Sequence, residues 1–185
     1  MTMTTYNFSA GPGVIPEEVV TQVKNEFEKN EHTQLSIMEI SHRSETFQNI
    51  IFDAEQKLRE LMAIPDEYAV VFLQGGGSLQ FEMLPLNFAT HQQNVALLDS
   101  GNFAAKAGEA IEALGKKLTV IDSTKQQHYQ QLPSLPSDFN ADAYDYLHIV
   151  TNNTIEGATF HQNNLPVTSG RLVADMSSNI LAEPY

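Results

Sequence analysis

The sequence contains no cysteine among its 185 residues, so it can form no disulfide framework, thiolate nucleophile or cysteine-based metal site. Basic residues are also few: 10 Lys and Arg stand against 23 Asp and Glu, a formal net charge of −13. A surface with this charge repels nucleic acid and anionic lipid, so we expect neither nucleic acid nor a membrane as a partner. No apolar run approaches the roughly 20 residues that a transmembrane helix needs.

Other familiar signals are missing too. The first residues show neither the basic nor the apolar region of a secretory signal peptide, and we expect a cytoplasmic protein. The six histidines lack the spacing of a His-Glu-x-x-His metal site, and no Gly-x-Ser-x-Gly elbow of a serine hydrolase occurs. With 42% hydrophobic and 18% charged residues, the composition is that of an ordinary globular protein with a sizeable core.

Apolar periodicity predicts helices that alternate with short strands. The predicted helices cover residues 16–30, 44–62, 78–87 and 102–114, and the predicted strands cover residues 69–73, 94–98, 117–121, 144–150 and 171–174. This alternation indicates an α/β protein with a doubly wound sheet and flanking helices. The 44–62 helix carries a stripe of apolar side chains that we expect to face the core. The stripe consists of Phe47, Ile50, Ile51, Ala54, Leu58 and Leu61.

The most informative stretch is residues 69–81. An apolar run, predicted to be a buried strand, is followed by Gly75-Gly76-Gly77-Ser78 and a helical pattern, for which Ser78 is the expected N-cap. Such a turn presents bare N–H groups and the positive end of a helix to a ligand, which suits a phosphate. The spacing is that of neither a Walker loop nor a Rossmann fingerprint, and a turn of this kind is often only a structural connection.

Three further strand ends carry polar residues, in segments 99–103, 151–157 and 175–179. Ligands of open parallel sheets bind beyond the carboxyl ends of the strands, so these segments are expected to share one crevice. Singly, each has an ordinary interpretation: turn residues, a core phenylalanine at Phe103, or a capping role for Asp175. Together they supply a phosphate cradle, an aromatic face, a Thr/Asn cluster and a carboxylate, a set that fits pyridoxal 5'-phosphate (PLP).

Five segments of the chain resemble the phosphoserine aminotransferases, in order along essentially its whole length. These segments are residues 7–12, 40–44, 73–81, 152–157 and 174–178. The resemblance implies a PLP-dependent aminotransferase of fold-type I, homodimeric, with active sites at the subunit interface. It implies transfer of an amino group between L-glutamate and 3-phosphohydroxypyruvate, giving O-phospho-L-serine and 2-oxoglutarate in serine biosynthesis. It leaves open whether 4-phosphohydroxythreonine, used in pyridoxine synthesis, is also a substrate.

The resemblance also implies roles for individual residues. Gly77 and Ser78 would hold the PLP phosphate, and Thr154 would bond the ring hydroxyl or the phosphate region. Phe103 would stack on the ring; many relatives have Trp there, which offers more stacking area. Asp175 would pair with the pyridinium nitrogen and keep it protonated, so that the ring can accept electrons.

Substrate contacts are implied near the N-terminus. Arg43 would bind the substrate carboxylate, since a planar guanidinium makes two parallel bonds where Lys makes one. His42 would contact the substrate phosphate, and the loop that begins at Ser9 would close over the substrate. On residues alone, the His42-Arg43 pair is equally consistent with an exposed loop.

One requirement of the reaction is not met. In the family, the Schiff-base lysine follows the Asp-x-Ser-Ser segment by about two dozen residues, whereas the sequence given ends 10 residues after Asp175. The lysines present, which we expect to be solvated surface residues, are Lys24, Lys29, Lys57, Lys106, Lys116, Lys117 and Lys125. Residues 1–185 therefore look like the N-terminal part of a large PLP-binding domain, without the C-terminal small domain and without turnover of their own.

Two alternatives remain open. The first is a non-catalytic half-enzyme, or a binding protein for a phosphorylated ligand or a full-length partner. The second is another fold-type I enzyme, such as a relative of cysteine desulfurase or alanine–glyoxylate aminotransferase. This second alternative accounts less well for His42-Arg43 and for segment 152–154.

Overall fold

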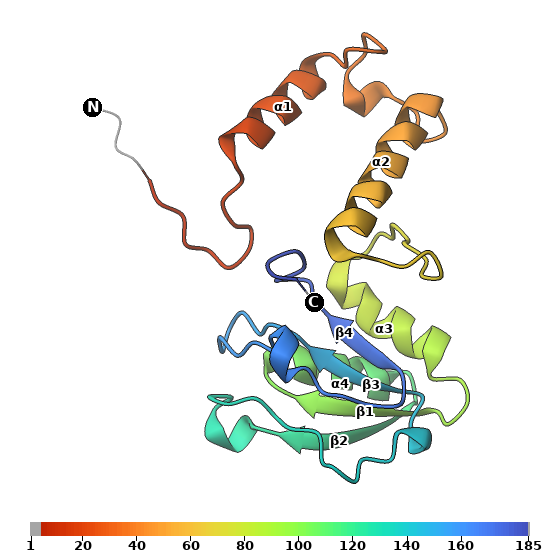
Figure 1. Cartoon of the computed structure of the whole chain (residues 1–185), viewed down its shortest axis with the longest axis vertical. Coiled ribbons are helices and arrows are strands. Elements are labelled where there is room, and N and C mark those ends of the chain that lie inside the picture. The colour runs from red at the N-terminus through yellow and green to blue at the C-terminus, as the bar shows by residue number, and fades with distance from the viewer. Residues whose placement is uncertain (1–4, 185) are drawn as a thin grey trace. The chain divides into compact units, whose positions relative to one another are not determined.

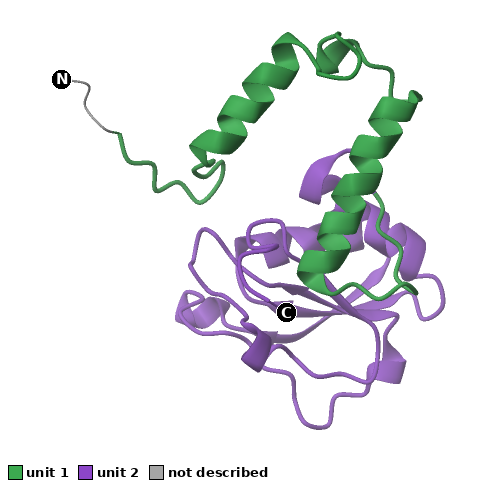
Figure 2. Ribbon diagram, turned by 45° about the horizontal axis from the view of Figure 1, so that its top comes forward, with its two compact units in different colours: residues 1–71 green, residues 72–185 purple. Residues whose placement is uncertain are grey.

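The computed structural model describes residues 5–184, and the chain divides into two compact units, Met1–Val71 and Phe72–Tyr185 (Figure 2). No helix within residues 5–184 combines the length and the apolar character needed to cross a bilayer.

Unit 1 is helical. Helix α1 (Glu17–Glu28) follows Pro16 and has Glu17 and Glu18 in its first turn, where acidic side chains complement the helix dipole. Helix α2 (Glu45–Met62) begins at Ser44, whose hydroxyl accepts a hydrogen bond from the backbone N–H of Phe47 at 3.3 Å. The 3-10 turn η1 (Ile37–Glu39) lies between the two helices. The predicted helices 16–30 and 44–62 are thus confirmed to within two residues.

The predicted packing of the α2 stripe is wrong. No residue of α1 or α2 is buried, and Ile50 and Leu61 of the stripe are 41% and 70% exposed. The periodicity does form one face of the helix, but residues 5–71 contain no sheet and no third long helix against which that face could pack. An amphipathic pattern sets which side of a helix is apolar, and the burial of that side needs a partner.

Unit 2 is an α/β unit around a four-stranded sheet (Figure 1). The strands lie in the order β2-β1-β3-β4 and all pairs are parallel. Their bounds are β1 (Asn94–Asp99), β2 (Lys117–Ser123), β3 (Tyr146–Val150) and β4 (Leu172–Asp175). The α/β class and four of the five predicted strands are confirmed, and both faces of the sheet are covered.

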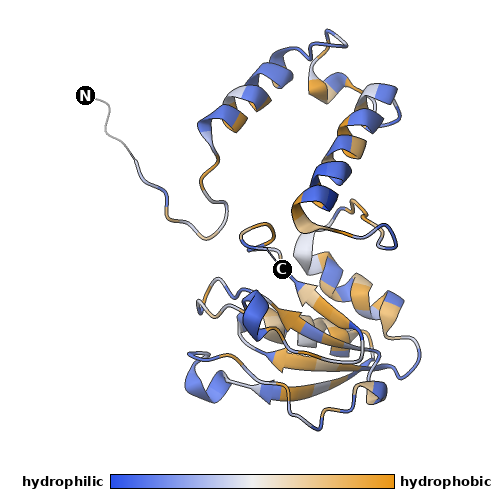
Figure 3. Ribbon diagram, viewed as in Figure 1, coloured by the Kyte–Doolittle hydropathy of each residue, from blue (hydrophilic) through white to orange (hydrophobic). Residues whose placement is uncertain are grey.

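Helices α3 (Gly76–Phe88) and α4 (Asn102–Ala113) lie against one face of this sheet, where Ile111 of α4 packs on Val95 and Tyr146. Side chains alternate between the faces of a strand, so Ala96 and Leu98 of β1 point to the opposite face, together with Leu147 and Ile149 of β3. There the cover comes from long irregular segments between β2 and β4, which contribute Phe139 and Phe160 among others. Hydrophobic residues accordingly concentrate on the strands (Figure 3).

Residues 69–73 do not form the predicted strand. The segment has no regular secondary structure, and its side chains Val71, Phe72 and Leu73 are 67%, 50% and 56% exposed. A strand needs a neighbour to satisfy its N–H and C=O groups, and none of the four strands of the described sheet pairs with this segment. The apolar, β-branched composition was therefore insufficient to predict its state here.

Candidate functional site

The carboxyl ends of the four parallel strands meet at one edge of the sheet, because all strands run in the same direction. Loops follow β1, β3 and β4 at this edge, and the turn that opens α3 contacts the loop after β4. The contact is tight: a Cβ placed on Gly77 would lie 2.9 Å from the hydroxyl oxygen of Ser177. Gly77 therefore lets the start of α3 approach the Asp175–Ser177 turn closely.

Helix α3 begins earlier than predicted. Its N-cap is Gly75, which has φ 101°, and Gly76 has φ 60°, so both occupy the left-handed region that favours glycine. Ser78 lies inside the first turn and is not the N-cap, which corrects the prediction; no side chain caps this helix. The first N–H groups of a helix have no intrahelical acceptor, so the uncapped turn offers backbone donors and the positive end of the dipole.

Asp175, the last residue of β4, has a carboxylate held by its own turn. The backbone N–H and the hydroxyl of Ser177 both donate to Oδ1, at 2.9 and 2.6 Å. The capping role considered from the sequence is therefore present. Both contacts use Oδ1, so Oδ2 keeps its lone pairs for other donors. The side chain is half-buried, at the edge where the loops meet.

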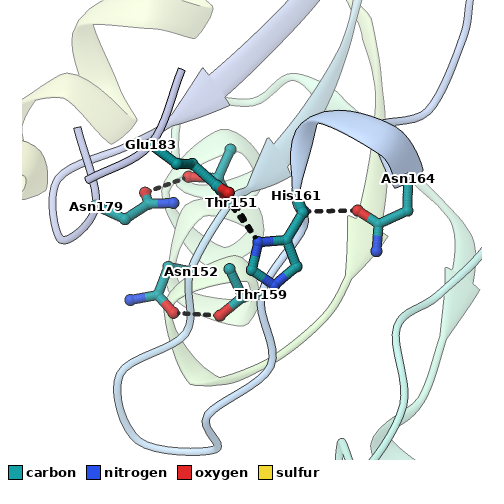
Figure 4. Close-up of polar contacts among 7 residues, drawn as sticks. All are labelled: Thr151, Asn152, Thr159, His161, Asn164, Asn179 and Glu183. Atoms are coloured by element: carbon teal, nitrogen blue, oxygen red, sulfur yellow. Dashed lines mark hydrogen bonds and ion pairs between the residues drawn. The ribbon is translucent and has the colours of Figure 1, made fainter. Parts of the chain in front are cut away.

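The loops after β3 and β4 are joined by hydrogen bonds (Figure 4). The buried hydroxyl of Thr151 lies 2.7 Å from Oδ1 of Asn179 and 3.0 Å from the carbonyl oxygen of Asp175. The amide of Asn152 donates to the Ser178 hydroxyl at 2.8 Å. These bonds fix the position of the Asp175 turn relative to β3.

Further hydrogen bonds and an ion pair hold the loops after β3 and β4 in place. The hydroxyl of Thr159 donates to Oδ1 of Asn152 at 2.6 Å, and Nδ1 of His161 lies 2.8 Å from a Glu183 carboxylate oxygen (Figure 4). The backbone N–H of His161 donates to Oδ1 of Asn164 at 2.6 Å. Segment 152–157 is one of the five segments that resemble the family. Its neighbours Thr159, His161 and Asn164, and Glu183 near the end of the chain, had no recognisable pattern in the sequence.

A second set of contacts joins the β1 and β3 ends. Oε1 of Glu156 accepts from the backbone N–H of Asn102, the first residue of α4, at 3.0 Å, and the buried amide of Asn153 donates to the Ser100 hydroxyl at 2.9 Å. A Cβ on Gly101 would lie 2.5 Å from Oδ1 of Asn153, so glycine is required by this approach. The sequence analysis assigned no role to Glu156, because its position at the start of α4, 54 residues earlier in the chain, is set by the tertiary structure.

The structure places the remaining predicted cofactor residues at this edge. Phe103, in the first turn of α4, packs against the cluster of Leu97, Ala104 and Val150, and the ammonium of Lys106 lies 5.4 Å from its ring centre. Phe103 thus packs against the core, as the first interpretation of this residue from the sequence had it. Thr154 is half-buried in the turn after β3.

A buried histidine was missed by the sequence analysis. His148 in the middle of β3 is 1% exposed, and neither ring nitrogen has a hydrogen-bond partner within residues 5–184. It lines a cavity of about 270 Å³ together with Gly77, Phe81 and Asp175. Its only signal in the sequence is a polar residue within an otherwise apolar strand.

The predicted substrate residues Ser9, His42 and Arg43 belong to unit 1, where all three are exposed. The predicted cofactor residues Gly77, Ser78, Phe103, Thr154 and Asp175 all belong to unit 2. Unit 2 also holds four lysines. Lys106 lies on α4, Lys116 directly precedes β2, Lys117 is its first residue, and Lys125 follows it.

Comparison with known proteins identifies the class to which this fold and site belong. Residues 5–185 match the family described as aminotransferase class-V. This match spans nearly the entire sequence, and the chain belongs to the aminotransferase class-V family.

Curated relatives that cover this chain almost completely are phosphoserine aminotransferases. The chain is 66% identical over 183 residues to the phosphoserine aminotransferase of Leuconostoc mesenteroides subsp. mesenteroides, covering 99% of this chain and 51% of that protein. The resemblance seen in the five sequence segments is thereby confirmed. The chain spans about half the length of the curated relatives it matches.

Solved structures agree with this similarity. Phosphoserine aminotransferase from Bacillus circulans subsp. alkalophilus has a TM-score of 0.90 at 38% identity, over 98% of this chain and 50% of that one. A PLP-bound phosphoserine aminotransferase from Trichomonas vaginalis has a TM-score of 0.82 at 28% identity, over 98% of this chain and 53% of that one.

Proposed function

We propose that this chain supplies the cofactor-binding strand ends of a phosphoserine aminotransferase. The whole protein would transfer an amino group between L-glutamate and 3-phosphohydroxypyruvate, giving O-phospho-L-serine and 2-oxoglutarate in serine biosynthesis. One observation carries the proposal: the uncapped first turn of α3 lies against the turn that holds the Asp175 carboxylate. The relatives named phosphoserine aminotransferase support the choice of substrates.

The residues present fit PLP. Gly77 approaches Ser177 so closely that a Cβ there would fill the space between α3 and the Asp175 turn. The first N–H groups of α3 are not capped by a side chain, so they can bind a phosphate. Asp175 is a fixed carboxylate with one oxygen not used by its turn, as a partner for a ring nitrogen requires. When bound, PLP acts as an electron sink that makes the α-proton of an amino acid acidic.

The chain's own residues would divide the work as follows. Gly77 and Ser78 bind the phosphate, Phe103 stacks against the ring, Thr154 bonds the ring hydroxyl or phosphate region, and Asp175 keeps the ring nitrogen protonated. A carboxylate at that nitrogen favours the protonated form because an opposite charge stabilises the cation.

Substrate binding would come from unit 1. Arg43 suits a carboxylate because its guanidinium donates two parallel hydrogen bonds. His42 would contact the substrate phosphate, and the Ser9 loop would cover the bound substrate. The exposure of all three side chains is consistent with groups available to a ligand.

The proton carried from the α-carbon needs a lysine that none of the seven lysines in the sequence supplies at the family's position. Within unit 2, Lys106 has a ready structural role, since its ammonium lies over Phe103. The 185 residues by themselves would therefore bind PLP without turnover. By its resemblance to the family, the whole protein would work as a homodimer. It would work in the cytoplasm, because its highly charged substrates do not cross a membrane unaided.

The direct test titrates the purified chain with PLP and follows binding by absorbance. Asp175→Asn should weaken binding about tenfold, because it loses one charge-assisted contact. Asp138→Asn, which changes an exposed acid in a loop, is the matched control and should bind like the unaltered chain. Equal affinity for Asp175→Asn and the unaltered chain would contradict the proposed role.

A second measurement addresses turnover. The chain is incubated with PLP, reduced with borohydride and weighed by intact mass spectrometry. We expect no stoichiometric adduct at any single lysine and no glutamate formed from phosphoserine and 2-oxoglutarate above a blank. An adduct at Lys106 that disappears in Asp175→Asn would show that the chain contains a working lysine.

A further inference from the structure

Helix α3, strands β3 and β4 and the turn after β4 line an open cavity of about 270 Å³, and the proposed cofactor residues Gly77 and Asp175 are part of its lining. Its lining is apolar at Phe81, Leu84 and Val173, and polar at His148 and Asp175. Gln80 and Ser177 add an amide and a hydroxyl to the same lining. Liquid water occupies about 30 Å³ per molecule and needs two to four polar partners, so the cavity is large and polar enough for several waters.

The sheet register places His148 and Asp175 on the same face. His148 pairs with Val173, and Val150 pairs with Asp175. Side chains two apart on a strand share a face, so all four lie on the helix-covered face of the sheet. Val150 packs against Ala104 of α4, whereas His148, Val173 and Asp175 line the cavity beside α3. His148 and Asp175 are diagonal neighbours. Phe81 of α3 lines the cavity, with its ring edge-on to the imidazole of His148 at 6.2 Å between centroids.

His148 is a polar group without a partner in the described part of the chain. A buried donor or acceptor left without a hydrogen bond is costly, and a neutral imidazole has one of each. Tyr146 on the same strand is 6.4 Å away between ring centres, in an edge contact. The hydrogen-bonding side chains that line the same cavity as His148 are therefore the Asp175 carboxylate, the Gln80 amide and the Ser177 hydroxyl.

We propose that His148 is a positioning residue for the cofactor site: its neutral imidazole donates, through water held in this cavity, to the Asp175 carboxylate and holds it oriented and ionised. Ser177 fixes Oδ1 of that carboxylate. The water bound to His148 would donate to the second carboxylate oxygen, Oδ2, and leave this oxygen one lone pair for the ring nitrogen of the cofactor. This inference rests on the proposed function only where it concerns the cofactor; the coupling between His148 and Asp175 stands on the chain alone.

The protonation state of His148 agrees with this role. Burial lowers the pKa of His148 to about 4, and the negative charge of Asp175 opposes part of that decrease. The imidazole is thus neutral at physiological pH and can donate one N–H while accepting one hydrogen bond. Removing the charge of Asp175 should lower the pKa of His148 further.

The first experiment measures the coupling without altering the core. The pKa of His148 is followed by NMR titration of its ring signals in the unaltered chain, in Asp175→Asn and in the control Asp138→Asn. We expect a lower pKa in Asp175→Asn and no change in Asp138→Asn. An identical pKa in all three proteins would overturn the proposal.

The second experiment measures the effect on the cofactor. PLP affinity is compared between the unaltered chain, His148→Phe and His148→Gln, with Tyr146→Phe as the control for loss of a buried polar group on the same strand. We expect binding about tenfold weaker in His148→Phe and partial recovery in His148→Gln, whose amide can still donate. Unchanged affinity in both His148 variants would refute the role of His148 and leave the proposed function intact.

The two experiments separate the two proposals. Failure of the unaltered chain to bind PLP would count against the proposed function, while the titration would still decide whether His148 and Asp175 are coupled. A pH profile of PLP affinity adds a signature that a merely structural residue would not produce. Affinity should fall toward pH 4 in the unaltered chain more steeply than in His148→Phe.

Discussion

The two units of this chain differ in what their apolar residues contact. In unit 1, helices α1 and α2 carry clear apolar faces, yet none of their residues is buried. In unit 2, β1 is buried on both faces along five of its six residues, and β3 along all five. Periodicity was equally readable in both, so the difference shows that a hydrophobic pattern becomes a core only when another element covers it.

The largest expected effect sets the core of unit 2 against the helices of unit 1. Leu98→Ala removes a side chain that is fully buried in β1 and should lower the free energy of unfolding by about 2–5 kcal/mol. Val23→Ala in α1, where the valine is 48% exposed, should change it by less than about 0.5 kcal/mol. Chemical denaturation followed by circular dichroism checks both. Similar decreases in the free energy of unfolding for the two variants would contradict the difference in packing between the two units.

The next effect comes from pH and the buried histidine. The pKa of His148 is about 4 in the folded chain against a usual value of 6.5, so the unfolded chain binds this proton first as pH falls. Stability should therefore decrease from pH 6.5 to pH 4, by about 3 kcal/mol from this group, and then level off.

Carboxylates also titrate in this range, so the contribution of His148 is read as the difference in pH slope between the unaltered chain and His148→Phe. The slope should be shallower in His148→Phe between pH 6.5 and pH 4. Equal slopes in the two proteins would mean that His148 is not buried as a neutral group.

A smaller and local effect is expected in unit 1. Ser44→Ala removes the N-cap of α2 and should cost about 1 kcal/mol of helix stability. Because unit 1 has its own contacts, hydrogen exchange by mass spectrometry should show faster exchange in residues 45–50 and unchanged protection in β1. Ser41→Ala is a useful comparison, since Ser41 precedes the cap; loss of protection in β1 would show that the units unfold together.

The smallest effect concerns the joint between the β1 and β3 ends. Glu156→Gln keeps the hydrogen bond to the N–H of Asn102 but removes the charge at the start of α4, and should cost about 0.5–1 kcal/mol. Glu112→Gln, near the other end of α4, removes an acid from an unfavourable position and should cost nothing. Thermal unfolding at low salt measures both, and equal midpoints for the two variants would exclude a helix-dipole role.

Much of the fold could be predicted because it depends on local patterns. Helices α1, α2 and α4 have apolar spacing and end signals such as Ser44 and Gly115, and the four strands of the sheet are short apolar runs bounded by turns. Residues 69–73 have the same composition as those strands, but strand formation depends on a neighbour that no local pattern specifies. The start of α3 was predicted at Ser78 because serine is a common N-cap. The helix instead begins at Gly76, where Gly75 and Gly76 adopt the left-handed conformation.

The candidate site divides in the same way. The glycine turn, Thr154 and Asp175 were visible as unusual residues after predicted strands, and the roles proposed for them await measurement. His148 was invisible as a site residue, since a histidine within an apolar strand has no motif. Its diagonal relation to Asp175 depends on the register of β3 against β4, which is a tertiary property.

By itself the sequence determined the α/β class, the order of the elements and the family, because each depends on residue types at fixed spacings along the chain. Only the tertiary structure decided which apolar faces are buried, which glycine is needed for the approach of α3 to Ser177, and which polar groups share the cavity with Asp175. The physical reason is that burial, close approach and hydrogen bonding are relations between segments far apart in the chain. Their free energies depend on positions that only packing creates.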